Sequence, residues 1–371
     1  MDFNQICQND SAFAVRCLPI DDHRGAEGVA VIAKLGFRVS ARGVVTWSSA
    51  PVRLIDEPGG PRGSIRYPSD YVGDKPGTDV ILVGTAYPPV NAPGAAPATE
   101  MDVSLRVGAL EKVVRVHGPR IYYEALGVLP GRPGPLEPVP LVYELTYGGL
   151  DTSDPMHAAV ERRNPIGMGF AVDRKKLVGT PVPPIEDPRA PLSSRSPAPA
   201  GFGVLDPSCE PRSNFAGTYD ERWQRERAPI RPTDFDLRHN CVASPGLWSE
   251  APLLGDEPIE VLGATPEGAW RFQLPRHEPE IACVMAGERR VLETHLDTLL
   301  IDADEMRLEL SYRVFIALPR KSELLQRIMV SSKTALPDSV LSAEALRRDR
   351  LLSSHAHDDH DHDHDDHEAS A

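Results

Sequence analysis

The sequence predicts a mainly β protein, with a two-sheet, sandwich-like body, a long irregular middle region rich in Pro and Gly, and a short C-terminal helix. The first observation behind this prediction is the composition, because the 371 residues include 37 Pro and 29 Gly. A proline inside a helix costs about 3 kcal/mol, so short strands joined by turns fit this composition better than helices. The second observation is the alternation of apolar and polar residues along several segments.

The alternating segments define the strands of the predicted body. In residues 28–39, every second residue from Val29 to Val39 is apolar, which is the period of a strand with one buried face. Residues 40–43 are typical of a hairpin turn, and residues 44–47 of its return strand. The other predicted strands, in chain order, are 79–84, 101–107, 111–117, 141–145 and 308–318.

The middle of the chain differs from these segments. Residues 181–211 contain nine Pro, with Gly201 and Gly203 among them, which predicts that regular structure is scarce there. A long irregular stretch inside a compact protein is usually disordered or functional. Because aromatic and polar residues are interleaved with the prolines, we predict an ordered surface loop.

We predict one β domain over residues 1–335 and leave open its division into two lobes near residue 150. The apolar spacing within residues 324–329 indicates a short helix near the end of this domain. A C-terminal helix is predicted over residues 336–352, with Asp338 as its cap.

Residues 353–371 form an acidic, His-rich tail, which we predict to be disordered. Imidazoles beside carboxylates could also bind Zn²⁺, Ni²⁺ or Cu²⁺, but only weakly, because nothing preorganises the ligands. The alternative of a metal-binding protein rests on the six histidines of this tail: His355, His357, His360, His362, His364 and His367.

Charge and composition exclude several classes of function. The formal net charge is −14, and seven of the acids lie in residues 355–371, which leaves −7 for the rest of the chain. Nucleic acid is therefore not expected as a ligand, since phosphate binding needs a basic patch. The N-terminal segment lacks the features of a signal peptide, and no apolar run approaches the roughly 18 residues of a membrane span. With five scattered cysteines that indicate reduced thiols, we expect a cytoplasmic protein without membrane insertion.

The usual catalytic motifs are missing from the sequence, which has no G-x-S-x-G elbow, no H-E-x-x-H and no P-loop. Carboxylates of the middle region leave one enzymatic alternative open, because two of them in a cleft could serve a carbohydrate-active or other hydrolytic enzyme as acid and base. The same residue types also form Asx-turns in irregular backbone. The carboxylates in question are Glu186, Asp206, Asp220, Asp234 and Asp236.

Short strings in the middle region form an ordered set. In chain order they are Tyr147-Gly-Gly149, Asn164-Pro-Ile-Gly-Met-Gly-Phe170, Pro184-Ile-Glu186, Pro199-Ala-Gly-Phe-Gly203, Pro211-Arg212, Gly217-Thr-Tyr-Asp220 with Trp223, and Pro232-Thr-Asp-Phe-Asp236. Together with Lys75-Pro-Gly-Thr-Asp-Val80 and Leu296-Asp-Thr298, this set resembles the domain-of-unknown-function 2169 family, whose members are encoded among type VI secretion genes in Gram-negative bacteria. The resemblance covers roughly residues 12–318.

The resemblance implies a non-enzymatic adaptor or chaperone that binds a type VI secretion effector and assists its loading onto the spike complex. Its partners would be the effector, a spike-tip protein or both, and no cofactor is expected apart from weakly bound metal at the tail. Aromatic side chains on stiff Pro/Gly loops suit such contacts, because they lose little rotamer entropy on binding. They could equally fasten the loops to the strand core. The candidate partner-binding residues are Asn164, Phe170, Phe202, Tyr219, Asp220, Trp223 and Phe235.

Overall fold

A computed structural model describes residues 2–90, 93–154, 156–318 and 325–333, and over these ranges the protein is mainly β, as the sequence predicts. The described residues, up to Lys333, form one compact unit. The predicted helix over residues 336–352 and the tail with its six histidines lie outside the described residues.

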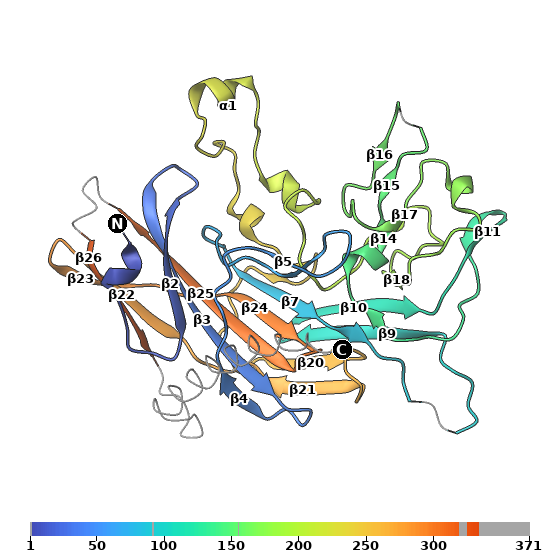
Figure 1. Ribbon diagram of the computed structural model, residues 1–371, viewed down its shortest axis with the longest axis horizontal. Helices are drawn as coiled ribbons and strands as arrows, with labels where there is room; N and C mark the ends of the chain where they lie inside the picture. Colours follow the sequence, from blue (N-terminus) through green and yellow to red (C-terminus); the bar gives the residue numbers. More distant parts are fainter. Residues whose placement is uncertain (1, 91–92, 155, 319–324, 334–371) are drawn as a thin grey trace, which may run out of the picture. The chain divides into compact units, whose positions relative to one another are not determined.

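The largest sheet has seven strands, in the order β19-β7-β24-β25-β3-β2, with β4 paired to the C-terminal end of β3 (Figure 1). The strands are β2 (Ala14–Asp21), β3 (Glu27–Val39), β4 (Val45–Ser48), β7 (Thr78–Val83), β19 (Trp248–Ser249), β24 (Leu296–Asp302) and β25 (Arg307–Ala317). Neighbours are antiparallel except β24 and β7, which are parallel. The sheet confirms four predicted strands: 28–39, 44–47, 79–84 and 308–318.

A five-stranded sheet packs against one face of the largest sheet. Its strands, in spatial order, are β18 (Ile185–Glu186), β10 (Leu110–His117), β9 (Glu100–Val107), β20 (Pro258–Leu262) and β21 (Ala269–Gln273). Alternate side chains of β3, from Val29 to Val39, share one hydrophobic core with Val103, Leu105 and Val107 of β9. The two sheets therefore form the predicted sandwich-like body, and the predicted strands 101–107 and 111–117 are confirmed.

The other face of β3 is buried as well, so the prediction of a single buried face for residues 28–39 is wrong. On this second face, Ala30 and Ile32 are buried as well as Lys34, and Lys34 lies in a cluster of charged pairs. Lys34 Nζ lies 2.9 Å from Asp70 Oδ2 and 3.1 Å from Glu309 Oε2 on β25, and Arg53 also pairs with Glu309. The apolar period does not show this burial, because Lys34 and two glycines interrupt the apolar residues of the second face.

A third sheet has four strands, in the order β1 (Cys7–Asn9), β26 (Leu325–Ser332), β22 (Pro279–Met285) and β23 (Glu288–Leu292). The helix predicted within residues 324–329 is wrong, because Leu325 begins β26. A bulge explains the error: Arg327 pairs with Val284 but Leu325 with Met285, so Gln326 is an extra residue. An extra residue shifts the period of a strand and produces the apolar spacing of a helix turn.

The remaining elements are short. Two-stranded ribbons join β5 (Glu57–Pro58) to β6 (Ile65–Tyr67), β8 (Thr85–Ala86) to β13 (Val139–Pro140), β11 (Tyr122–Ala125) to β12 (Gly127–Pro130), β14 (Tyr147–Gly148) to β17 (Met168–Gly169), and β15 (Leu150–Asp151) to β16 (Ala159–Val160). The helices are α1 (Glu221–Glu226) and the 3-10 turns η1 (Phe3–Ile6), η2 (Tyr143–Leu145), η3 (Arg174–Leu177), η4 (Arg212–Phe215) and η5 (Leu237–Asn240).

Two predictions for the middle of the chain have different outcomes. The strand predicted at residues 141–145 is wrong, since η2 begins at Tyr143. Glu144 is the physical reason: it is buried, and its carboxylate accepts hydrogen bonds from the backbone amides of Arg62 and Ser64, which breaks the alternation. Regular structure is scarce in residues 181–211, as predicted, where β18 is the strand present.

Candidate functional site

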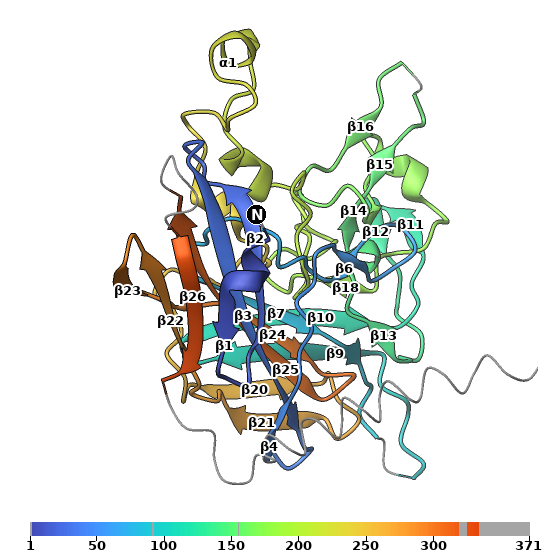
Figure 2. The ribbon, with the colours of Figure 1, turned by 60° about the vertical axis from the view of Figure 1, so that its left-hand side comes forward.

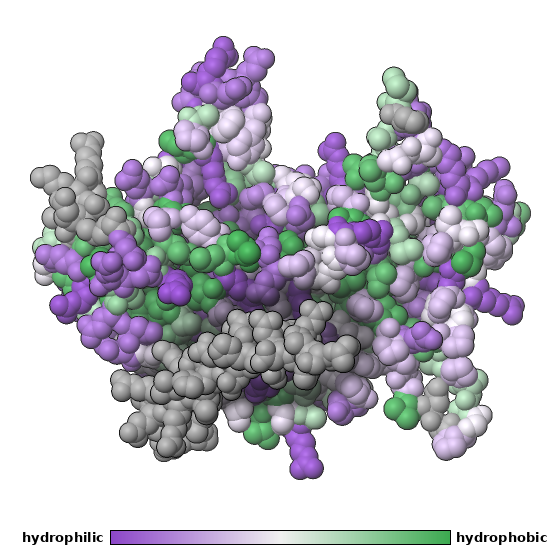
Figure 3. All heavy atoms as spheres, viewed as in Figure 1, coloured by the Kyte–Doolittle hydropathy of each residue, from purple (hydrophilic) through white to green (hydrophobic). Residues whose placement is uncertain are grey.

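Residues 216–236 form an arm that projects away from the sheets and carries α1 near its tip (Figures 1 and 2). We call this segment the α1 arm. Four predicted contact residues lie on it: Tyr219, Asp220, Trp223 and, at its base, Phe235. Figure 3 shows mostly hydrophilic residues at the tip of the arm, whereas the neighbouring projection with β15 and β16 also carries apolar ones.

The base of the α1 arm is closed by contacts between its two ends. Thr218 donates to the Asp234 carboxylate through its backbone N (3.0 Å) and its Oγ1 (2.7 Å), and these bonds lower the pKa of Asp234. Gly217 has a φ of +81°, and a Cβ at this position would lie 2.9 Å from Asp234 Oδ1. Phe235 is buried beneath, with the Arg231 guanidinium 4.3 Å from its ring centroid. The closed base therefore needs a glycine at position 217, where a side chain would crowd Asp234.

The tip of the arm holds an aromatic pair in a fixed geometry. Asp220 caps α1, and its Oδ1 accepts a 2.7 Å hydrogen bond from Trp223 N. The Trp223 indole Nε1 donates to the Ile230 carbonyl at 2.8 Å, which ties the helix to the returning chain. The Tyr219 ring lies edge-to-face on Trp223, with 4.6 Å between the centroids, and Tyr219 is 55% exposed. A rigid aromatic surface thus faces solvent.

Phe235 lies at the base of the arm, whereas Asn164, Phe170 and Phe202 lie in the body. Phe202 has an exposed fraction of 0% within the main core, and Phe235 is also buried. Asn164 is buried, and its Nδ2 donates to Tyr143 O and to Thr146 Oγ1, both at 2.8 Å. A buried side chain has no surface to offer a partner, so Asn164, Phe202 and Phe235 are corrected to packing residues. Phe170 is half-buried.

The five carboxylates of the middle region all accept hydrogen bonds from backbone amides. The donors are Leu192 N to Glu186, Ser208 N to Asp206, Trp223 N to Asp220, Thr218 N to Asp234 and Arg238 N to Asp236. Glu186 also lies 2.6 Å from His117 Nε2; burial alone would raise its pKa, but these hydrogen bonds outweigh burial and lower it. Turn and cap geometry explains these residues, so they give the hydrolase hypothesis no support.

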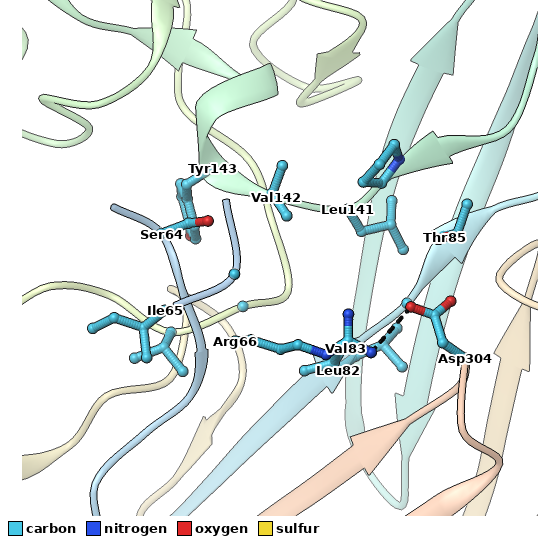
Figure 4. A pocket seen from close by; sticks show the side chains of 15 residues that line it. Ser64, Ile65, Arg66, Leu82, Val83, Thr85, Leu141, Val142, Tyr143 and Asp304 are labelled. Atoms are coloured by element: carbon cyan, nitrogen blue, oxygen red, sulfur yellow. Dashed lines mark hydrogen bonds and ion pairs between the residues drawn. The ribbon is translucent and has the colours of Figure 1, made fainter. Parts of the chain in front are cut away.

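A cavity of about 230 Å³ lies where β6, β7 and η2 meet the Gly-Phe-Gly string (Figure 4). Its wall includes Leu141, Tyr143 and Gly203. The Arg66 guanidinium crosses the cavity to Asp304 Oδ2 at 3.3 Å, and lies 3.4 Å from Asp302 Oδ2 (Figure 4). Because two carboxylates already balance this cation, the cavity offers little charge for an anionic ligand.

Two charged residues of one recognised string, Lys75 and Asp79, lie beside Thr298 of another string in the interior of the protein. Lys75 Nζ donates to Asp79 Oδ2 at 2.7 Å and to Thr298 Oγ1 at 2.8 Å, and all three residues are buried. The Asp79 carboxylate also accepts hydrogen bonds from Val242 N (2.9 Å) and Ala243 N (3.1 Å). Sequence reasoning quoted these strings without assigning a role to the charges. The available signal was a charged residue, Asp79, at the start of an otherwise apolar strand, with Lys75 four residues before it.

Two features are absent from the described part of the chain, a group of metal-ligating side chains and a helix that could span a membrane. No three His, Cys, Asp or Glu side chains are grouped there so that they could hold a metal ion. No helix among the described residues is both long enough and apolar enough to cross a membrane. The five cysteines are free thiols, as predicted.

Comparison with known proteins identifies the family. Residues 24–313 match the model of a family described as "uncharacterized protein conserved in bacteria (DUF2169)". The chain belongs to this family. The DUF2169 match includes the α1 arm and the five-stranded sheet, whereas β1 and β26 lie outside it. No curated protein and no solved structure matches the chain.

Proposed function

We propose that this DUF2169 protein is a non-enzymatic adaptor or chaperone, which binds a type VI secretion effector in the bacterial cytoplasm and assists its loading onto the spike complex. The single observation that carries the proposal is the α1 arm, a stiff projection with an aromatic pair at its tip. The resemblance of the motif strings to proteins encoded among type VI secretion genes supports the choice of partner. The family match supports that resemblance.

The arm has the physical properties of a protein-binding element. Its aromatic pair is held by the Asp220 cap and the Trp223 hydrogen bond, so little side-chain entropy remains to be lost on binding. Aromatic side chains of this kind often dominate the affinity of an interface, and truncation of one costs about 2 kcal/mol or more. A loss of this size corresponds to a decrease in affinity of about 30-fold.

Co-purification with the effector encoded beside the gene tests the proposal. The tagged protein is isolated from cells that produce the effector, and both the bound effector and the secreted effector are measured. Tyr219→Ala removes the exposed ring but keeps the cap and the indole hydrogen bond, so we expect bound and secreted effector to fall together. Tyr123→Ala is the matched control, because Tyr123 is 47% exposed on β11, away from the arm.

Two results would contradict the proposal. One is a stable effector that is loaded and secreted normally in cells without the protein. The other is equal loss of bound effector in the Tyr219 and Tyr123 variants, since the arm would then have no special part in binding.

A further inference from the structure

Two hollows adjoin at the foot of the α1 arm. The smaller one, about 20 Å³, is lined by Asp21, Asp74 and Phe315 together with Arg231 and Phe235 of the arm. The larger one, about 330 Å³, shares Asp74 and Phe315 and is also lined by Asp297 of β24 and Arg313 of β25. We call this continuous depression the acidic groove; its acidic residues are Asp21, Asp22, Asp74, Glu293 and Asp297.

Several of these carboxylates are not used by the fold. Among the described residues, the carboxylates of Asp21, Asp74 and Glu293 take part in no hydrogen bond or ion pair, whereas Asp22 accepts the amides of its own turn. Asp74 is exposed as a residue, but partial burial of its carboxyl group raises its pKa. The charges of Arg313 and His23 lower the pKa and only partly offset this effect. Three cations also line the groove, Lys75, Arg231 and Arg313, and Lys75 is already paired with Asp79, so the five carboxylates leave negative charge unbalanced.

A buried acceptor also faces this groove. Asp297 is 1% exposed, lines the larger hollow, and its Oδ2 accepts no hydrogen bond from the described residues. Arg313 forms an ion pair with Asp297, with its Nη2 3.5 Å from Oδ2, but makes no hydrogen bond to it. The Arg313 guanidinium donates instead to the carbonyls of Gly73 and Asp70, both at 3.1 Å, which leaves acceptor capacity at Asp297. A buried acceptor without a donor is costly unless a ligand or water supplies one.

An aromatic wall completes the groove. Phe315 is half-buried and lines both hollows. The ring lies against Gly28 of β3, where a Cβ would come within 2.2 Å of Cζ, so only glycine permits this position. Carboxylates beside an aromatic ring are the usual surroundings of a guanidinium or ammonium group in a protein.

We propose that the acidic groove binds an arginine side chain from a basic segment of the partner protein. The groove starts at the base of the α1 arm, so a partner that contacts Tyr219 can place such a segment along it. The identity of this partner rests on the proposed function, whereas binding of the cationic side chain does not. A guanidinium fits the planar pairing with Asp297 and the unpaired carboxylates of Asp74 and Glu293 better than a point charge does.

A peptide titration tests the groove without the effector. Acetyl-Gly-Arg-Gly-Arg-Gly-amide is titrated into the isotopically labelled full chain, and backbone amide shifts are followed by nuclear magnetic resonance. We expect saturable shifts at Asp74, Glu293 and Asp297. The same peptide with citrulline, which is neutral and of the same shape, should not bind.

Matched variants distinguish binding of the peptide in the groove from a general effect of the protein's net charge. Asp74→Asn with Glu293→Gln changes two exposed residues and should weaken the arginine peptide about tenfold. Glu267→Gln, in the turn between β20 and β21 outside both hollows, should leave binding unchanged. Equal binding of the citrulline peptide, unchanged binding in the double variant, or Ca²⁺ at the same amides in competition with the peptide would overturn the assignment.

The peptide titration and the co-purification experiment can fail independently of each other. If the arginine peptide fails to bind but the effector still co-purifies through Tyr219, the groove assignment is wrong and the adaptor proposal stands. If the peptide binds and no effector co-purifies, the groove is a cation site and the adaptor proposal is wrong.

Discussion

Lys112 provides a test of the electrostatics of the body. It lies on β10 with an exposed fraction of 8%, and its Nζ donates to the Pro245 carbonyl at 2.8 Å. Burial lowers the pKa of Lys112 to about 7, partly opposed by Asp187. Lys112→Met keeps the length of the side chain and removes the buried charge. We predict that this change raises the free energy of unfolding at and below neutral pH.

The size and the pH dependence of the effect follow from linkage. An unfolded lysine has a pKa of about 10.4, so a folded pKa of about 7 corresponds to a penalty of about 5 kcal/mol when lysine is charged in both states. Between these two pKa values the unfolded state binds more protons, so the stability of the natural protein rises with pH. Loss of the hydrogen bond to Pro245 subtracts about 1 kcal/mol. The advantage of the variant is thus about 4 kcal/mol at pH 6 and about zero at pH 9.5.

Denaturant unfolding of both proteins at pH 6 and pH 9.5, followed by tryptophan fluorescence, measures this difference. Lys333→Met is the control, because the Lys333 side chain is 41% exposed in an ion pair with Glu278 and its removal should change stability by less than about 1 kcal/mol at either pH. The reasoning is refuted if Lys112→Met destabilises the protein at pH 6, or if its effect is the same at both pH values.

Two further predictions concern the arm and its support. Gly217→Ala should loosen the arm base by about 1–2 kcal/mol, because Gly217 has a φ of +81° and a new Cβ would crowd Asp234; faster tryptic cleavage within residues 222–231 would show this. Gly203→Ala, where a Cβ would meet nothing within 4 Å, should leave cleavage unchanged, and equal cleavage of both variants would contradict the argument. Asp79→Ala should lower the free energy of unfolding by about 3–5 kcal/mol, since Lys75 is left buried without its partner. Asp56→Ala removes an exposed turn acceptor and should cost about 1 kcal/mol; an equally small loss for Asp79 would show that the buried pair contributes little.

Four strands of the sandwich, β3, β9, β10 and β25, were predictable because each presents alternate apolar residues to a shared core, whereas β2, β20, β21 and β24 were not predicted. The alternation from Val29 to Val39 marks β3 directly, and β9, β10 and β25 follow the same rule. The predicted secondary structure was wrong where successive side chains do not alternate between the two faces of a strand. Gln326 bulges out of β26 and imitates a helix, while the buried Glu144 turns the chain at η2.

The candidate site was predictable only in part, because loops have no period from which exposure can be read. Phe202 and Tyr219 stand in similar Gly-containing strings, yet one is fully buried and the other is 55% exposed. What separates them is the neighbour each loop meets: Phe202 O accepts a hydrogen bond from Leu82 N of β7, whereas the Tyr219 ring packs against Trp223 of its own arm. Such neighbours are set by tertiary structure, which a single sequence does not show.

Hydrogen bonds between segments far apart in the sequence connect the buried charges of Lys75 and Asp79 to the chain that follows the α1 arm. Asp79, fixed by Lys75, accepts the amides of Val242 and Ala243, and the Asn240 side chain donates to the Asp74 carbonyl at 2.7 Å. These bonds fasten the chain just after the arm to β7 in the largest sheet. Because the returning end of the arm is fixed in this way, the orientation of its tip depends on charges that no partner can touch. Changes at Asp79 should therefore weaken partner binding through the position of the arm, even where the surface of the arm is unaltered.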